Sequence, residues 1–238
     1  MDPVTGAVAI MGLKHVGAPM AELATDFLSR VLAPAADATG VALAYPIEEW
    51  HRRRVERANE MVVSAARILE GDGVDPQPVP GRILFPILQS GSLEEDDALR
   101  STWARLLASA AAADTQSRVS PAFAHVLAQL NPVEVSVIEH LFVDHLDANG
   151  QLRPFSFDAV AARFGMDSIQ AASMMGNLFR LGIVMPELTL TMRPVGAEKQ
   201  ERDESGQDDG PDKGNVTPFG ASFFVACSGK WKFTYEDR

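Results

Sequence analysis

The apolar residues that follow Pro46 recur every three or four positions, which is the spacing of an amphipathic helix. Acids in the first turn and Gly71 after the last apolar position mark the two ends of this helix. The expected inward positions are Val55, Ala58, Val62, Ala65 and Leu69. Three prolines lie between Asp72 and Gly81, and because proline lacks the backbone N–H donor, we expect an extended connection there.

Two more helices are predicted before residue 131. Ser92 stands before a run of acids, which is typical of a serine cap followed by charges that complement the helix dipole. This helix runs to about Asp114, and its apolar stripe consists of Leu99, Trp103, Leu106, Leu107 and Ala110. The next helix begins at Ser120 and turns four residues inward: Phe123, Val126, Leu127 and Leu130. Residues 46–130 are therefore predicted to form a helical domain.

The pattern changes after residue 131. Asn131-Pro132 caps a helix that ends at Asn149-Gly150, and a helix–turn–helix follows with Gly165-Met166-Asp167 as its turn. The second helix of this motif, residues 168–181, has four expected inward residues: Ile169, Ala172, Met175 and Phe179. A helix, a tight glycine-containing turn and a second helix form the helix-turn-helix motif.

The residues after this motif predict a small β-hairpin and one more helix. Gly182 leads into a β-prone run at residues 183–185, and a second strand is expected at residues 215–216. Thr217-Pro218 then opens a final helix, with threonine as the cap and proline in the first turn. Two strands after a helix-turn-helix indicate a winged-helix-like domain over residues 131–238.

Two segments lie outside this pattern. Residues 1–45 are apolar and rich in Ala and Gly, and they predict short helices with small-residue faces. Residues 193–215 hold an acidic insertion between the predicted strands, and we interpret it as a long solvated wing or a disordered insertion. The predicted fold class is mostly α: an N-terminal helical region followed by a C-terminal winged helix-turn-helix with a small β-hairpin.

Composition narrows the possible partners. The net charge of −11 argues against a surface broadly built for nucleic acid or anionic lipid, because both are held by clustered Lys and Arg. Cys227 is the single cysteine, so no intrachain disulfide can form, and its expected role is packing. No apolar run is long enough to span a membrane, and no signal peptide is evident. We expect a cytoplasmic protein.

Residues that could carry chemistry do not form a recognisable catalytic or metal-binding motif. The sequence has no phosphate-binding glycine loop, no paired-cysteine spacing and no HExxH. His140 and His145 are five apart on one helix, so they cannot close on one metal from one helix face. His140 and Asp144 are four apart and could pair, but we interpret them as part of a solvated helix face. The acids Glu94–Asp97 are interpreted as capping groups. We predict no catalytic residues, no metal and no cofactor.

Three stretches of the chain carry a family resemblance. They read ILQSGSLEEDDALRSTWARLLASAAA from Ile87, SPAFAHVLAQLNPVEVSVIEH from Ser120 and TPFGASFFVAC from Thr217. In order and spacing they resemble the Abi-alpha (abortive infection alpha) family, a bacterial domain family linked to the response in which an infected cell stops supporting phage. The likeness covers roughly residues 45 to 228. It implies a role in phage defence and carries no catalytic residues with it.

Two groups of side chains are candidate binding sites. The outward face of the second helix of the helix-turn-helix presents residues able to reach base edges or a partner: Gln170, Ser173, Asn177 and Arg180. A basic patch near the start of the first long helix consists of Arg52, Arg53, Arg54 and Arg57. The first is interpreted as a protein-contact or structural face, and the second as a helix surface paired with neighbouring acids. A docking patch for an acidic partner, RNA or membrane phosphate is the alternative for the arginines.

These observations predict a non-enzymatic bacterial phage-defence protein that acts through protein binding or self-association. The alternative is a winged-helix DNA-binding transcriptional regulator, which the helix-turn-helix favours but the acidic charge does not. Membrane association through residues 4–45 is a third possibility. No small-molecule substrate is evident.

Overall fold

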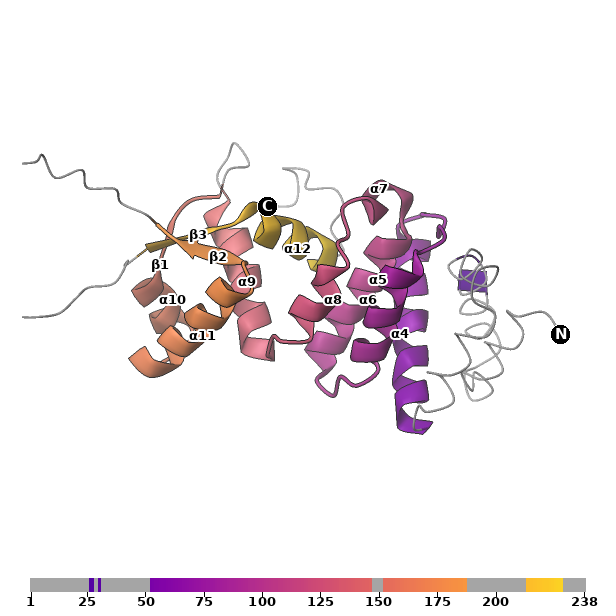
Figure 1. Ribbon diagram of the computed structural model, residues 1–238, viewed down its shortest axis with the longest axis horizontal. Coiled ribbons are helices and arrows are strands. Elements are labelled where there is room, and N and C mark those ends of the chain that lie inside the picture. The colour runs from indigo at the N-terminus through magenta and orange to yellow at the C-terminus, as the bar shows by residue number, and fades with distance from the viewer. Residues whose placement is uncertain (1–25, 28–29, 31–51, 147–151, 188–212, 229–238) are drawn as a thin grey trace, which may run out of the picture. The chain divides into compact units, whose positions relative to one another are not determined.

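The computed structural model describes residues 26–27, 30, 52–146, 152–187 and 213–228 (Figure 1). The chain divides into two compact units: unit 1 takes the described residues up to Val135 and from Ser222 onward, and unit 2 is Ser136–Ala221. Within the described residues the fold is mostly helical with one small antiparallel sheet, as predicted. Most of the predicted apolar segment 1–45 and of the acidic insertion 193–215 lies outside the described residues.

Unit 1 is built from packed helices that enclose a single apolar core. Figure 1 shows α4, α5 and α6 side by side, and α6 contacts both of the others. Its helices include α4 (Arg52–Gly71), α5 (Gly81–Gly91), α6 (Asp97–Ala111), α7 (Ala113–Gln116) and α8 (Ala122–Leu127). The predicted inward stripes of α6 and α8 are buried throughout, which confirms the helical periodicity.

Helix α6 is the most enclosed element of unit 1. Ten of its 15 residues are buried, and Trp103 is its largest buried side chain. Several buried positions are alanine, so the backbones of neighbouring helices can come close without leaving a cavity. Its buried Ser109 hydroxyl donates to the Ala226 carbonyl at 2.6 Å, and the Thr115 hydroxyl donates to the Ser109 carbonyl at 2.6 Å. Both buried hydroxyls therefore have hydrogen-bond partners, and the partner of Ser109 comes from a distant part of the sequence.

The N-terminus of α6 differs from the prediction. Ser92 is buried at the end of α5, where its hydroxyl donates to the Gln89 carbonyl at 2.9 Å. Asp96 caps α6 instead, because its carboxylate accepts from the N–H groups of Ala98 and Leu99 at 2.9 and 3.0 Å. A helix cap needs a side-chain oxygen two or three residues before the free N–H groups, and Asp96 meets that spacing for a helix that begins at Asp97.

The sequence pattern predicts no helix at the position of α5. Pro86 is inside this helix and removes one backbone donor, so local propensity argues against it. Four apolar residues of α5 are nevertheless buried: Ile83, Leu84, Ile87 and Leu88. Their burial against the core stabilises a helix that the proline weakens.

The extended connection between α4 and α5 agrees with the prediction. Gln77 donates its backbone N–H to the Ala111 carbonyl at 2.6 Å, and Pro76 forms an isolated bridge with Ala112. The Gln116 side chain donates to the Pro78 carbonyl at 2.7 Å. The proline-rich segment is thus held against the C-terminal end of α6 by hydrogen bonds.

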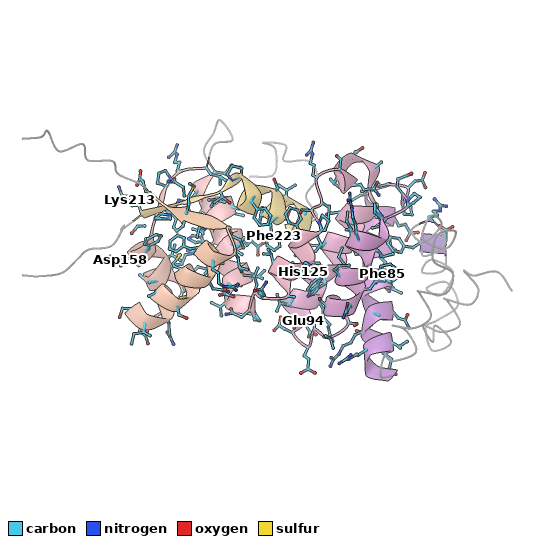
Figure 2. All side chains as sticks on the ribbon, viewed as in Figure 1. Phe85, Glu94, His125, Asp158, Lys213 and Phe223 are labelled. Carbon is cyan, nitrogen blue, oxygen red and sulfur yellow. The ribbon has the colours of Figure 1, made fainter. Side chains whose placement is uncertain are left out.

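The C-terminal part of α12 (Pro218–Ser228) completes the unit 1 core. Phe223, which is labelled in Figure 2, lies edge-on to Phe123 with ring centroids 5.6 Å apart. Cys227 is buried in the same core. The end piece that resembles the Abi-alpha family therefore includes residues whose visible role is packing.

Unit 2 combines helices with a three-stranded antiparallel sheet. Along the chain its elements are α9 (Pro132–His145, whose first residues belong to unit 1), β1 (Phe155–Ser156), α10 (Phe157–Arg163), α11 (Ser168–Arg180), β2 (Val184–Pro186) and β3 (Lys213–Val216). The strand order is β1-β3-β2, with Phe155 opposite Gly214 and Met185 opposite Asn215. The sequence pattern predicts β2 and the end of β3 but not β1. A strand of two residues is too short to show an alternation of apolar and polar side chains.

The inward face of α11 is also different from the predicted one. Met174, Met175 and Leu178 are buried, whereas Ile169 is 80% exposed. A capping box between Asp167 and Gln170 fixes the first turn of α11, and the burial of Met174, Met175 and Leu178 leaves Ile169 on the opposite, solvent-facing side. Ile169 is therefore a large apolar side chain on the surface of unit 2.

The start of α12 closes unit 2 through backbone contacts. The Thr217 hydroxyl donates to the Gly182 carbonyl and accepts from the Gly220 N–H at 2.9 Å, which confirms Thr217 as the cap. Gly220 is buried, and a Cβ placed on it would overlap the carbonyl group of Ile183. Only glycine allows this approach between α12 and the chain that leaves α11.

We predict that Gly220→Ala destabilises unit 2 by about 1–3 kcal/mol, because the added methyl group has to displace backbone rather than a flexible side chain. Thermal unfolding followed by circular dichroism measures the effect. Gly176→Ala is the matched control, since a Cβ added at this exposed α11 position meets no atom within 4 Å. The control should gain about 0.5–1 kcal/mol from helix propensity. Equal melting temperatures for both variants would contradict the close contact at Gly220.

Candidate binding site

The four arginines of the predicted basic patch lie in the first two turns of α4. The side chains of Arg52 and Arg53 lie outside the described part of the structure, and Arg54 is half-buried. Arg57 pairs with Glu95 at 3.0 Å and also donates to the Leu93 carbonyl at 3.5 Å. The partner of Arg57 therefore comes from the α5–α6 connection, which a reading of one helix face does not reveal.

The acidic run 94–97 has a structural partner at each position. Glu94, labelled in Figure 2, accepts from the backbone N–H groups of Glu95 and Asp96 at 2.9 and 3.0 Å. Asp96 caps α6, Glu95 pairs with Arg57, and Asp97 pairs with Arg100. The interpretation of these acids as capping and surface-pairing groups is consistent with all four contacts.

A cleft lies where α4 meets the α5–α6 junction. Its volume is about 320 Å³. It is lined by Arg57, Glu60, Met61, Ser64, Gly91, Asp97, Arg100 and Ser101. One arginine comes from each of the two helices, so the cleft brings together positive charges that are 43 residues apart in the sequence. The sequence pattern predicts Arg57 as part of the basic patch but does not predict Arg100. No motif and no helical spacing relates these two residues.

The second candidate group lies on α11 as expected from the helical spacing. Gln170, Ser173 and Arg180 are exposed and Asn177 is half-buried. Gln170 is used by the capping box, where its side-chain oxygen accepts from the Asp167 N–H at 3.1 Å. Arg180 donates to Asn177 at 2.6 Å. The face therefore mixes exposed polar groups with groups that stabilise the helix itself.

The charges of unit 2 do not form an excess of cations around α11. Its described residues carry four cations: Arg153, Arg163, Arg180 and Lys213. They carry five acids: Glu139, Asp144, Asp158, Asp167 and Glu187. Lys213 on β3 and Asp158 on α10 are labelled in Figure 2. Duplex binding relies on several phosphate contacts, and this near-balance offers few.

A histidine pair occupies the C-terminal half of α9. His140 pairs with Asp144 at 2.5 Å, and Arg163 lies 3.8 Å from the same carboxylate. The rings of His140 and His145 are edge-on with centroids 5.8 Å apart, and Phe155 packs on His145. The side chain of His140 is only 14% exposed, so the predicted solvated helix face is wrong, because aromatic rings cover it.

Burial lowers the pKa of His145, and the neighbouring His140 lowers it further. Asp144 and the Pro154 carbonyl act in the opposite direction with smaller effect. Burial also raises the pKa of the Cys227 thiol, so this cysteine stays protonated at neutral pH. Among the described residues, no three His, Cys, Asp or Glu side chains are placed to hold a metal ion. No helix in the described part is both long and apolar enough to cross a membrane.

Comparison with known proteins gives one match. A family model described as abortive infection alpha matches residues 50–227. No curated protein and no solved structure matches the chain. The matched range runs from just before α4 to the last turn of α12. It includes α4 and α6, whose arginines line the cleft, and α11.

The low pKa of His145 predicts a loss of stability in mild acid. Above the ordinary histidine pKa of about 6.5 the residue is neutral in both states and contributes no pH dependence. As the pH falls below that value, the unfolded chain takes up the proton first, so unfolding becomes easier until the lower folded-state pKa is passed.

We therefore expect the melting temperature to fall between pH 7.5 and 5.5, and to fall less in His145→Gln than in the wild-type chain. His140, Asp144 and Arg163 face this ring and remain in both proteins. His125→Gln in unit 1 is the control, because His125 is exposed and should leave the slope unchanged. An identical slope in all three proteins would contradict a shifted His145.

Proposed function

The chain belongs to the abortive infection alpha family, and from this premise we propose that it is a non-enzymatic bacterial phage-defence protein that acts in the cytoplasm through protein binding or self-association. The observation that carries the proposal is the family match over residues 50–227. This range includes α4 to α11, all but the last residue of α12, and the whole of unit 2.

The roles of the family-like stretches support binding over chemistry. Trp103 is core packing, Asp96 is a helix cap, and Gly220 is a close backbone contact. Asn131 and Glu134 form a capping box in which each side chain accepts from the other residue's N–H, at 2.9 and 2.8 Å. Because these residues maintain the scaffold, the defence activity is assigned to surfaces that the scaffold presents.

We infer that unit 2 is a winged helix used for protein contact. Its element order is helix, strand, helix, helix and two strands, and the sheet order β1-β3-β2 places the last strand in the middle. Gly165 has a φ of 63° in the turn between α10 and α11, a conformation that glycine adopts easily. The 80% exposed Ile169 on α11 supports a protein partner, since an apolar side chain gains most from contact with another apolar surface.

A DNA-binding transcriptional regulator is the second candidate. The same element order favours it, because the second helix of such motifs commonly enters the major groove. Gln170, Ser173 and Arg180 are exposed on α11 and have the donors and acceptors that read base edges. The near-balance of charge in unit 2 and the capping role of Gln170 weigh against it.

The defence proposal predicts that expression of the full chain in a bacterial host lowers phage plaquing and reduces survival of infected cells. Ile169→Glu should abolish this protection, because a charge replaces the exposed apolar contact without entering the core. Val143→Glu is the matched control: Val143 is 54% exposed on α9, and its replacement should leave protection intact. Plaquing efficiency and survival are measured for both variants beside an empty control.

A chain lacking residues 1–45 extends this test. Loss of protection on deletion would assign an effector role to that segment, and retained protection would place the activity in residues 46–238. No protection by the full chain against a broad phage panel would remove the defence proposal. Equal loss in Ile169→Glu and Val143→Glu would remove the partner surface on α11.

The DNA-binding alternative predicts that Arg180→Ala weakens duplex binding and reduces the salt slope by about one phosphate contact. Fluorescence anisotropy of a labelled duplex at several salt concentrations measures both quantities. Arg118→Ala in unit 1 is the control, because Arg118 is exposed outside unit 2. An absence of duplex binding by the full chain at low salt would end this alternative.

A further inference from the structure

We infer that the cleft between α4 and the α5–α6 junction binds the phosphate group of a small phosphorylated molecule through Arg57 and Arg100. The inference concerns unit 1 alone and stands independently of the phage-defence proposal. It rests on the volume of the cleft, on the two arginines from different helices that line it, and on the different exposure of its positive and negative groups.

The walls of the cleft are two helix faces with helical spacing. Helix α4 contributes Arg57, Glu60, Met61 and Ser64, and α6 contributes Asp97, Arg100 and Ser101. Met61 and Gly91 are the buried members of the lining. A Cβ on Gly91 would lie 2.6 Å from the Met61 sulfur, so glycine at this position leaves room for the methionine. The cleft thus has an apolar inner part and a charged rim.

The two arginine side chains of the cleft are less exposed than the carboxylate side chains that pair with them. The side chain of Arg57 is 23% exposed and that of its partner Glu95 is 81% exposed. Arg100 is 33% exposed, while Asp97 is 87% and Glu60 is 66% exposed. The guanidinium groups are therefore partly enclosed by protein, whereas the carboxylates extend into solvent and can move away.

This asymmetry makes the carboxylates replaceable. Exposed ion pairs contribute little to stability, because both groups are well solvated when apart. An incoming oxyanion would take over hydrogen bonds that Glu95 and Asp97 now make, and the released carboxylates would return to water. Exchange of one anion for another leaves the buried parts of the arginine side chains in place.

A phosphate fits the donors better than a planar carboxylate does. Arginines from two different helices line the cleft, and Ser64 lies on the α4 wall, whereas the Ser101 hydroxyl donates to the Asp97 carbonyl at 3.1 Å. Arginines on two separate helices, unlike a single guanidinium fork, suit an anion with several oxygens that are not in one plane, as in phosphate. The volume of about 320 Å³ is larger than a phosphate ion alone and lies at the small end of the range for ligand pockets. The expected ligand is therefore a small phosphomonoester.

The test is calorimetric titration of the full chain at low ionic strength with inorganic phosphate, glycerol 3-phosphate, ribose 5-phosphate and AMP. Arg57→Gln and Arg100→Gln should each weaken binding by about 10-fold or more, because a charge-assisted contact is lost. Arg82→Gln is the matched control, an exposed α5 position outside the lining, and it should bind like the wild type.

Glu95→Gln should change the binding affinity in the opposite direction. Removal of the competing carboxylate should tighten phosphomonoester binding by about 2- to 5-fold, the size of an exposed ion pair. Glu70→Gln changes the net charge equally at an exposed site outside the cleft and should have no such effect. A gain in affinity cannot come from misfolding, so this pair keeps the test informative if an arginine variant is unstable.

Several results would overturn the inference. These are no heat of binding for any of the four probes at millimolar concentration, equal weakening by Arg57→Gln and Arg82→Gln, and equal affinity of Glu95→Gln and Glu70→Gln. If inorganic phosphate binds and none of the three esters does, the ligand is not a phosphomonoester. Binding of single-stranded RNA without the small esters would assign the arginines to a macromolecule.

Discussion

The burial of α6 is the constraint on which unit 1 depends. A helix with ten of its 15 residues buried has to be covered on several sides, and α4, α5 and the C-terminal part of α12 provide that cover. Alanines along α6 let the neighbours approach, and Trp103 fills the space that they leave. Because α6 is buried, its polar side-chain groups need hydrogen-bond partners within the protein. Ser109 and Thr102 hydroxyls donate to carbonyls, whereas the buried Trp103 Nε1 has no hydrogen-bond partner among the described residues.

Several polar residues that stand out in the sequence lie at helix starts, where they act as caps. Asp96, Asn131 with Glu134, Asp167 with Gln170, and Thr217 each satisfy N–H groups at the start of a helix. A residue that caps a helix can look like a candidate for chemistry or recognition when only its type is known. Gln170 illustrates this, because its side-chain oxygen is used by the Asp167 N–H while the residue remains exposed on α11.

Charge is distributed differently in the two units, and this decides which surfaces suit which partners. In unit 1 two partly enclosed arginines face exposed carboxylates, an arrangement in which the anion can be exchanged. In unit 2 the described cations and acids nearly balance, and the most exposed large apolar side chain among the described residues is Ile169. A small anion in the first and a protein surface on the second are the contacts that these properties favour.

The periodicity of the sequence by itself determined the mostly helical class, the buried faces of α6 and α8, the turn before α11 and the Thr217 cap. Those features depend on neighbours within a few residues, and helical spacing or a cap motif contains that information. Only the tertiary structure decided that α5 forms despite Pro86 and that Ile169 faces solvent. Only the tertiary structure also paired Arg57 with Glu95 and brought Arg100 to the same cleft. Each of these follows from contacts between residues far apart in the sequence, whose free energy of burial or pairing outweighs local preference.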